Sequence, residues 1–586
     1  MAAPTESAVA SQDHSGDGSW TGRAAQLAAR LHLTSPAVQG LVALVAYLAV
    51  WILWRTEPLL AHPSQAQLDP SSMDPSIFIW SLRWWPYALT HGLSPLHTAQ
   101  IGAPAGYNLA WDTTVPPLAL LAWPLTAAIG PIAAFSVLVA LSIPVSGWAA
   151  FVLCRRLTGR FWPALAAGFV YGFSAYEMNH IVAGQLDLAF SVLLPLMAYL
   201  VVAWRDGAIR APIFVVLLAL ALAAQFYLFL ETFAFVTAIG ALALLAAWAL
   251  VGPATRPIVT RLAGLAGIAW LGSIVLAAPF LAAALANVPA SFHRRRGATS
   301  IDLAGLVVPR RGQDFGLSSL SAVADRLHAA SFDGYVGIPL LVLALAFTVL
   351  CWSRRITRFL AVMLVVVVVG ALGPALYVDR QLVTKLPWAA LFQLPVVRGA
   401  FASRLMVFAF LILAVMMALW LAGPARSSAA QLGRWALALL AIAAVAADVP
   451  ALAINPSGTP AFIAAAQYRT YLKPGATVVV ASATGNLGLR WQAEADFYFR
   501  VAGGFINSAF NGHTDLPAGV DDLAKGPVTP ASVSSFRRYL TSARISAILV
   551  DADSAPKWSW KLRRAGLRPL HSGRPVGGVI IYRAGR

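Results

Sequence analysis

Charged residues are scarce in this sequence. Asp, Glu, Lys and Arg make up 11% of its 586 residues and 59% are hydrophobic, whereas a typical soluble domain carries about 25% charged residues. A soluble chain of this length would need far more charge to cover its surface. Most of the surface must therefore face something other than water.

Cysteine is almost absent, and so are the common catalytic motifs. The two cysteines, Cys154 and Cys351, lie in or at the end of apolar runs, which excludes a disulfide framework and a CxxC metal site. No HExxH is present, and the C-terminal region lacks GxxxxGK[ST], a GxGxxG opening a helix, and GxSxG. The sequence therefore predicts no metal ligand set and no nucleotide-binding domain.

The net charge of +18 first suggests a nucleic-acid partner. The basic residues, however, form short clusters between apolar runs, as positive-inside signals and lipid-facing patches do. We therefore expect membrane lipids and no nucleic acid as partners.

Long apolar runs are abundant, and many approach the roughly 20 residues that cross a bilayer. They predict a mainly α fold, a polytopic bundle of transmembrane helices. The predicted spans are 36–55, 114–130, 131–154, 162–177, 189–204, 212–230, 232–251, 262–288, 336–352, 358–377, 404–422 and 434–453.

The basic clusters predict the topology. Placing them all in the cytoplasm leaves 178–188, 289–335, 378–403 and 454–586 outside the plasma membrane. Twelve crossings that start inside would put the last segment inside, which conflicts with the charge pattern. The weakest predicted span is 114–130, which holds three prolines and is either re-entrant or matched by a weak span hidden in 56–113. The predicted number of crossings is therefore 11–13.

Three regions follow. Residues 1–34 have no early apolar stretch and predict a disordered cytoplasmic segment with a basic amphipathic helix at 21–33 rather than a signal peptide. Residues 35–455 form the transmembrane domain, whose external loop 56–113 contains a predicted helix, 75–90, lying along the membrane surface. Short β-rich stretches and a helical pattern make 456–586 a small extracytoplasmic α/β domain.

The chemistry lies in the external segments, where carboxylates accompany Arg and Lys. This combination suits transfer from a lipid-linked sugar phosphate: a guanidinium binds the leaving phosphate, an Asp takes the proton of the acceptor hydroxyl, and a divalent cation (Mg, Mn or Ca) is a candidate cofactor. Asp74 is the best candidate for the base. A plain helix-capping role is the alternative, and Asp69-Pro70 repeats the Asp-Pro dipeptide.

Several short motifs are scattered along the chain: Asp74-Pro75 with Trp80-Ser81-Leu82-Arg83-Trp84, Pro104–Leu109, Tyr171–Tyr176, Gly184–Phe190, Ser300–Leu303, Gly334–Leu340, Ser403-Arg404, Trp491–Glu494 and Phe499–Gly504. Together they resemble the GT-C superfamily of membrane glycosyltransferases, in an actinobacterial form. The resemblance implies a polyprenyl-phosphate sugar donor and a first-loop catalytic acid at Asp74. It also implies a second acidic residue at Asp187 and a donor-phosphate contact at Arg404. The superfamily's paired first-loop acids are replaced here by Asp74-Pro75, so metal dependence stays open.

Five more residues are candidates for binding the donor or substrate, and most of them also have a simpler structural interpretation. Gln185 can be a polar helix-end residue, Asn108 a turn residue, and Glu231 an interfacial loop residue rather than a cavity-facing one. Arg295, within a basic run, fits an anionic headgroup or plain solvation. Tyr335 belongs to a family-like motif.

His180, alone in its loop, is expected to be solvated rather than catalytic. The leading hypothesis is therefore a glycosyltransferase that moves arabinofuranose or mannose from a polyprenyl-phosphate donor to a cell-envelope glycan, lipid or protein. Two alternatives stay open: a lipid or polysaccharide transporter or flippase, which would carry charges within its spans, and a non-catalytic envelope assembly protein, which would tolerate loss of Asp74.

Overall fold

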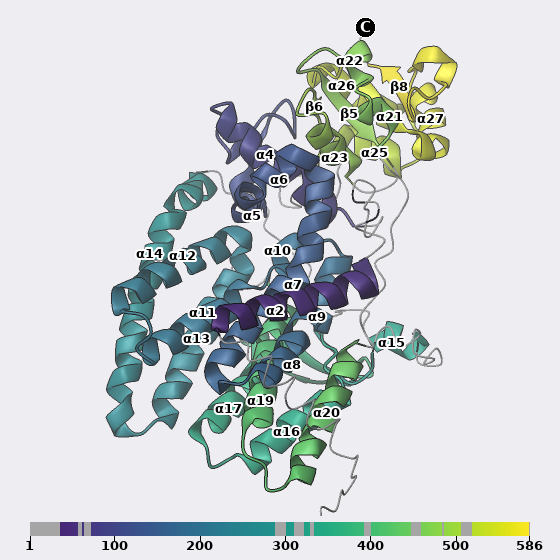
Figure 1. The fold of residues 1–586 in the computed structure, drawn as a ribbon. Helices are drawn as coiled ribbons and strands as arrows, with labels where there is room; N and C mark the ends of the chain where they lie inside the picture. The colour runs from purple at the N-terminus through teal and green to yellow at the C-terminus, as the bar shows by residue number, and fades with distance from the viewer. Residues whose placement is uncertain are drawn as a thin grey trace, which may run out of the picture.

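The computed structural model describes residues 35–56, 61, 63, 72–286, 300–309, 321–327, 333–391, 400–446, 459–482, 486–504 and 518–584. The helix predicted at 21–33 and the candidate residue Arg295 lie outside these ranges. Figure 1 shows a helical body with a smaller α/β domain at one end.

Helices dominate residues 35–446. Their bounds are α2 Pro36–Trp51, α4 Asp74–Thr90, α5 Pro116–Leu121, α6 Trp123–Ile129, α7 Pro131–Thr158, α8 Phe161–Gly172, α9 Ala175–Val182, α10 Leu186–Ala189, α11 Leu193–Arg205, α12 Ala211–Leu228, α13 Leu230–Leu250, α14 Arg256–Ala286, α15 Ser321–Leu327, α16 Ile338–Leu350, α17 Arg355–Ala371, α18 Trp388–Leu391, α19 Met406–Ala422 and α20 Ser428–Ala446. Two small hairpins accompany them, β1 His97–Thr98 with β2 Tyr107–Asn108, and β3 Ala375–Val378 with β4 Gln381–Lys385.

Eight helical segments of the described chain are long and apolar enough to cross a membrane. They contain α2, α7, α10 with α11, α12, α13, α14, α19 and α20. The helices α8 and α16 are apolar but shorter, and α17 has 17 residues. Together these segments correspond to every predicted span except 114–130, so the described chain alternates direction through eleven helices.

The segment 114–130 is not a span. It forms α5 and α6, of six and seven residues, and each begins with a proline in its first turn. A seven-residue helix is only about 10 Å long, too short for a bilayer core. Without this segment, eleven of the twelve predicted spans have a helical counterpart in the described chain, and an odd number of crossings would remove the parity conflict.

The bundle has two chemically different ends. The start of α7 contacts the C-terminal domain, where Glu494 accepts a hydrogen bond from the backbone N–H of Ile132; we call this the domain end. The helix α7 has 28 residues and is about 42 Å long, and its last turn carries Arg155 and Arg156. Following the alternation, the other clusters, at 205–210, 256–261, 354–358 and 426–434, lie at the same level; we call this the basic end.

Small residues bring α2, α7 and α8 close together. A Cβ on Gly168 would lie 2.5 Å from the carbonyl oxygen of Gly147, and one on Gly172 would lie 2.8 Å from the Cα of Gly147. The hydroxyl of Tyr47 then donates to the carbonyl of Leu165 over 2.7 Å. Close backbone approach at small residues is how apolar helices associate without a hydrophobic driving force.

The C-terminal domain is a four-stranded sheet covered on both faces. Its strands, in the order β6-β5-β7-β8, are β5 Thr477–Ala481, β6 Arg500–Val501, β7 Ala547–Asp551 and β8 Val579–Arg583; β8 alone is antiparallel. Alternate residues face opposite sides. One set packs with α25 Ala518–Lys525, α26 Pro530–Ser542 and α27 Ala555–Arg564, the other with α21 Ala461–Ala464, α22 Tyr468–Tyr471 and α23 Leu487–Glu494.

This domain docks on α4, the helix predicted at 75–90. The indole N–H of Trp80 donates to the Gln492 side-chain oxygen over 2.8 Å, and the Gln492 amide nitrogen donates to the Gln100 carbonyl over 2.7 Å. Trp80 and Trp84 also meet the ring of Phe497 edge-on. The helix is therefore largely buried within the protein, with Trp80 and Trp84 facing the C-terminal domain. Its position along a membrane surface stays a prediction.

Candidate functional site

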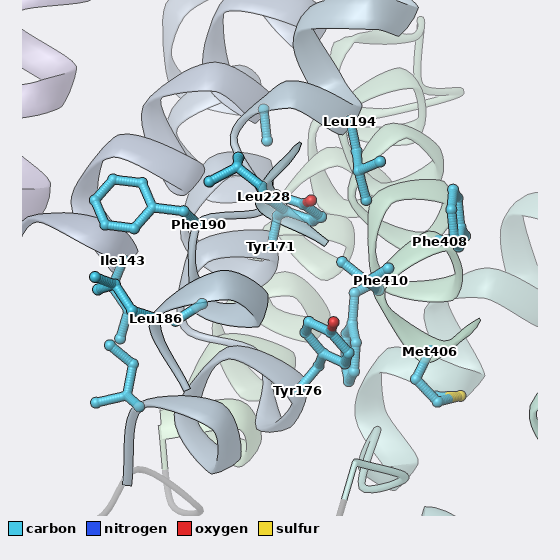
Figure 2. Close-up of a cluster of buried hydrophobic side chains, with 14 of the residues drawn as sticks. Ile143, Tyr171, Tyr176, Leu186, Phe190, Leu194, Leu228, Met406, Phe408 and Phe410 are labelled. Carbon is cyan, nitrogen blue, oxygen red and sulfur yellow. The ribbon is translucent and has the colours of Figure 1, made fainter. Parts of the chain in front are cut away.

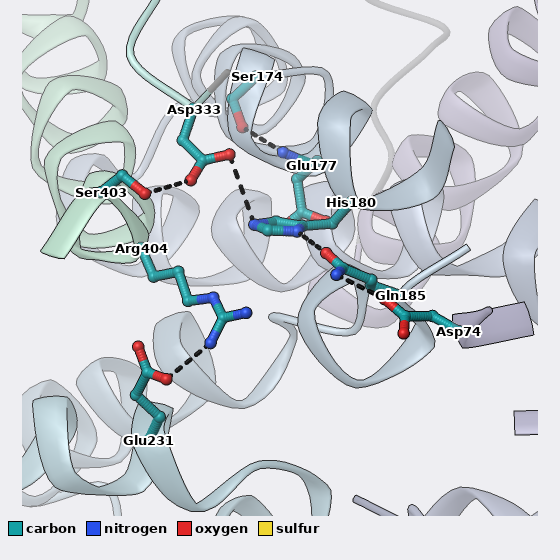
Figure 3. A network of polar contacts seen from close by, with 9 residues as sticks. All are labelled: Asp74, Ser174, Glu177, His180, Gln185, Glu231, Asp333, Ser403 and Arg404. Atoms are coloured by element: carbon teal, nitrogen blue, oxygen red, sulfur yellow. Dashed lines mark hydrogen bonds and ion pairs between the residues drawn. The ribbon is translucent and has the colours of Figure 1, made fainter. Parts of the chain in front are cut away.

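A polar cluster lies at the domain end of the bundle. Its side chains come from the first turn of α4, from α9 and the loop after it, from the start of α13, from the loop before α16 and from the turn before α19 (Figure 3). Neighbouring helices form an apolar core that includes Tyr171 of α8, Leu194 of α11, Leu228 of α12 and Phe410 of α19 (Figure 2). A packed core of this kind holds the polar groups in fixed positions.

Asp74 is the first residue of α4, and Met73 occupies the N-cap position. Asp74 is therefore not the N-cap residue that the alternative interpretation assumed. Its carboxylate still lies in the first turn, where the helix dipole favours negative charge. Its Oδ2 accepts a hydrogen bond of 2.8 Å from the Gln185 amide. This contact joins the two candidates Asp74 and Gln185, which are 111 residues apart.

Gly184 allows that contact. It adopts φ +69°, and a Cβ at this position would lie 2.4 Å from Cγ of Pro75. The left-handed backbone and the lack of space both require glycine here. The loop after α9 can therefore press against the first turn of α4.

A chain of polar contacts continues from Gln185. Its side-chain oxygen lies 2.6 Å from Nδ1 of His180, and Nε2 of His180 lies 3.6 Å from Asp333. The Ser403 hydroxyl donates to the other Asp333 oxygen over 2.8 Å. Because the Gln185 amide nitrogen is used by Asp74, the network assigns the hydrogen of neutral His180 to Nδ1.

His180 is therefore not the solvated residue we expected. It is 6% exposed, and burial lowers its pKa below 6.5, with Arg404 acting in the same direction and Asp333, Gln185 and Asp74 opposing it. Burial thus favours the neutral form of the ring. Its Nε2 has no hydrogen-bond partner in the part of the chain that the structure describes.

Arg404 forms the second half of the cluster. Its guanidinium contacts Glu231 over 2.6 Å and lies over the rings of Phe229 and Phe401, at 4.9 and 4.5 Å from their centroids. The other Glu231 oxygen accepts from the Phe401 backbone N–H over 2.7 Å. Glu231 is therefore a partly buried site residue rather than a plain loop residue, and it fixes the direction of the arginine.

Asp187 connects the two halves electrostatically, since its carboxyl group interacts with the charges of both Asp74 and Arg404. It is 7% exposed, and its Oδ1 is buried with no hydrogen-bond partner among the described residues. One oxygen of Glu177 is in the same condition, while the other accepts a hydrogen bond from the Ser191 hydroxyl. Unsatisfied buried acceptors are costly, so these atoms suit a ligand that brings hydroxyl donors.

Two other predicted residues lie within the described ranges. Asn108 caps a turn by accepting from Ala110 N–H and donates to the Ala283 carbonyl, so both ends of its amide serve the fold. Tyr335 is buried two residues after Asp333, with its hydroxyl near Gly337 at the start of α16.

Sequence reasoning missed His180, Asp333, Ser403 and Glu177 as members of the cluster. The available signal was their position: each lies within, or within a few residues of, a motif already singled out. No group of three or more His, Cys, Asp or Glu that could hold one is found among the described residues, so no divalent cation is assigned to the site.

No family model and no curated protein matches this sequence. The fold, however, is similar to solved structures. The arabinofuranosyltransferase AftD from Mycobacteria superposes with a TM-score of 0.55 at 14% identity over 93% of this chain. The chain shares its fold with this arabinofuranosyltransferase.

This chain spans 40% of the length of AftD. A mutant form of AftD gives a TM-score of 0.53 at 15% identity, over 93% of this chain and 41% of that one. The Archaeoglobus fulgidus oligosaccharyltransferase, solved with a tethered acceptor peptide, gives 0.47 at 13% identity, over 93% and 74% of the two chains.

Proposed function

We propose that this protein is a membrane glycosyltransferase that moves a sugar from a polyprenyl-phosphate donor to a cell-envelope acceptor. Asp74 is the general base, and Arg404 binds the phosphate of the lipid. The observation that carries the proposal is one polar cluster, at the domain end, holding an anchored carboxylate and an anchored guanidinium with Asp187 interacting with both. The name of AftD favours arabinofuranose over mannose as the sugar.

The chemistry follows from the two charges. The acceptor hydroxyl oxygen forms a bond to the anomeric carbon of the sugar, while the bond from that carbon to the phosphate oxygen breaks. Asp74 accepts the hydroxyl proton. Arg404 stabilises the negative charge of the departing polyprenyl phosphate, and Glu231 keeps the guanidinium in place before the donor arrives.

The remaining groups position the reactants. Gln185 fixes the direction of the Asp74 carboxylate by donating to its Oδ2. The free oxygens of Asp187 and Glu177 and the Nε2 of His180 are candidates for hydrogen bonds from sugar hydroxyls. These steps are derived for the residues of this chain alone, and none is routed through the divalent cation considered from the sequence.

The orientation is part of the proposal. The basic end faces the cytoplasm, so the cluster and the C-terminal domain face the outside of the plasma membrane, where envelope acceptors are exposed. The transporter reading is less well supported, because the charged cluster lies at one end of the bundle rather than along a path through it. The acceptor is an envelope glycan, lipid or protein.

The test is transfer of label from a polyprenyl-phosphate sugar by the Asp74→Asn variant. We expect a loss of at least about 100-fold, as general-base catalysis contributes roughly 10²–10⁴-fold. The matched control is Asp69→Asn, which changes the other Asp-Pro dipeptide and should retain activity. Full activity of Asp74→Asn would remove Asp74 as the base, and donor release without transfer in the wild type would favour transport.

A further inference from the structure

A second site candidate lies far from the polar cluster, at the basic end. A cavity of about 400 Å³ opens between the turn joining α11 to α12 and the first turns of α14. Three arginines line it, Arg205, Arg210 and Arg261, together with the apolar side chains of Trp204 and Ile258. The cavity thus combines a concentrated positive charge with an apolar wall.

The positive charge of this cavity is not neutralised by the described part of the protein. Asp206 is the one acidic residue of the α11–α12 turn, and it is shared by Arg156 and Arg205, each at 3.3 Å. No ion pair of Arg210 or Arg261 with a described acidic residue is present. Two guanidiniums that converge on one cavity from different helices, with no carboxylate to meet them, suit a phosphate group.

The apolar wall shows where the rest of such a ligand would lie. Trp204 packs near Phe214, at the level where tryptophan marks the membrane interface. From the cavity, α14 presents a stripe of exposed apolar side chains: Ile268, Leu271 and Val275 are 57%, 61% and 71% exposed. Their spacing of three and four residues places them on one helix face, along which an acyl chain can lie.

We propose that this cavity binds the headgroup phosphate of an anionic phospholipid, with the acyl chains along the exposed face of α14. A positive-inside signal alone requires only basic loops; it does not require two unpaired arginines in one cavity beside an apolar track. The site would anchor α14 against α11 and α12 in the membrane. This inference is independent of the glycosyltransferase proposal.

The test is lipid retention by the purified full-length protein, measured by native mass spectrometry with phosphatidylglycerol or phosphatidylcholine. The wild type should retain one phosphatidylglycerol in preference to phosphatidylcholine. The Arg210→Gln/Arg261→Gln double variant should lose about 10- to 30-fold of that affinity, as expected for two basic residues near an anionic lipid. The corresponding lysine variant should keep part of it.

The matched control is Arg160→Gln/Arg426→Gln, which removes the same charge from exposed positions of the basic end outside the cavity. An equal loss of phosphatidylglycerol affinity in the control would show that general electrostatic attraction, and not the cavity, retains the lipid, and would overturn the proposal. So would equal retention of both lipids by the wild type. Displacement of phosphatidylglycerol by millimolar inorganic phosphate would assign the cavity to free phosphate instead of lipid.

Discussion

At the residue scale, Gly184 controls the position of the proposed base. Replacing it by alanine would push a Cβ into Pro75 and displace the first turn of α4. Since a misplacement of about 1 Å can cost about 100-fold in rate, we expect Gly184→Ala to lower transfer by a factor of that order. The control is Gly207→Ala: Gly207 has φ +76°, but a Cβ added there would have no neighbour within 4 Å. The Gly207→Ala variant should lose a little stability and no transfer activity. Equal losses of activity in both variants would show that backbone strain, and not the displacement of α4, lowers transfer.

His180 makes a pH-dependent contribution to stability. Its pKa is lowered by burial, so below pH 6.5 the unfolded chain binds a proton that the folded protein does not. Stability should therefore fall as the pH decreases from 6.5 toward the folded-state pKa, and be fully present above pH 6.5. Thermal unfolding in detergent between about pH 5 and 8 measures this. His180→Gln should flatten the profile, whereas His97→Gln, at an exposed position, should not; an unchanged His180→Gln profile would contradict the assignment.

At the element scale, α4 and the C-terminal domain form one unit through Gln492. Its amide is bonded to Trp80, Gln100 and Phe499. The Gln100 carbonyl also accepts from the Val501 N–H, so Gln492→Leu removes the side-chain partner of two buried groups, the Trp80 indole and the Phe499 carbonyl. Each such group costs about 1–3 kcal/mol, and we expect at least about 2 kcal/mol of destabilisation, seen as a lower melting temperature and faster proteolysis at the domain junction.

The exposed ion pair at the same interface provides the comparison. Arg83 contacts Asp496 at 2.8 Å, with side chains 27% and 55% exposed. Surface pairs contribute about 0–1 kcal/mol, so Asp496→Asn should have little effect. Asparagine also tolerates the positive φ of this position. A larger loss for Asp496→Asn than for Gln492→Leu would show that the ion pair, and not the buried amide, holds the domain.

The same elements show what sequence can and cannot predict. Eleven of the predicted spans follow from apolar length, since a bilayer crossing demands it. The run 114–130 was wrongly predicted to be a span because it is as hydrophobic as one. Its prolines instead begin two short helices. Contacts such as Asp74 to Gln185, or Trp80 to Gln492, join residues 111 and 412 apart. Local periodicity gives no information about contacts between residues so far apart in the sequence. The cluster around His180 could therefore not be predicted from the sequence.

At the scale of the whole molecule, the proposed function depends on the orientation in the membrane. If the basic end is cytoplasmic, the polar cluster and the C-terminal domain share the outer side, where a lipid-linked donor and an envelope acceptor can meet. Ser572 is exposed in the C-terminal domain and Ser428 is exposed at the basic end. Single cysteines at these positions, in a background where Cys154 and Cys351 are replaced by alanine, report the two sides.

A membrane-impermeant maleimide applied to intact cells should label Ser572→Cys, and should label Ser428→Cys only after permeabilisation. The expectation rests on the positive-inside rule and on helix alternation from α7 to α20. Labelling of Ser428→Cys alone would invert the protein and place the proposed active site in the cytoplasm, away from envelope acceptors. Labelling of both in intact cells would mean an even number of crossings between them, which the single passage of α20 does not allow.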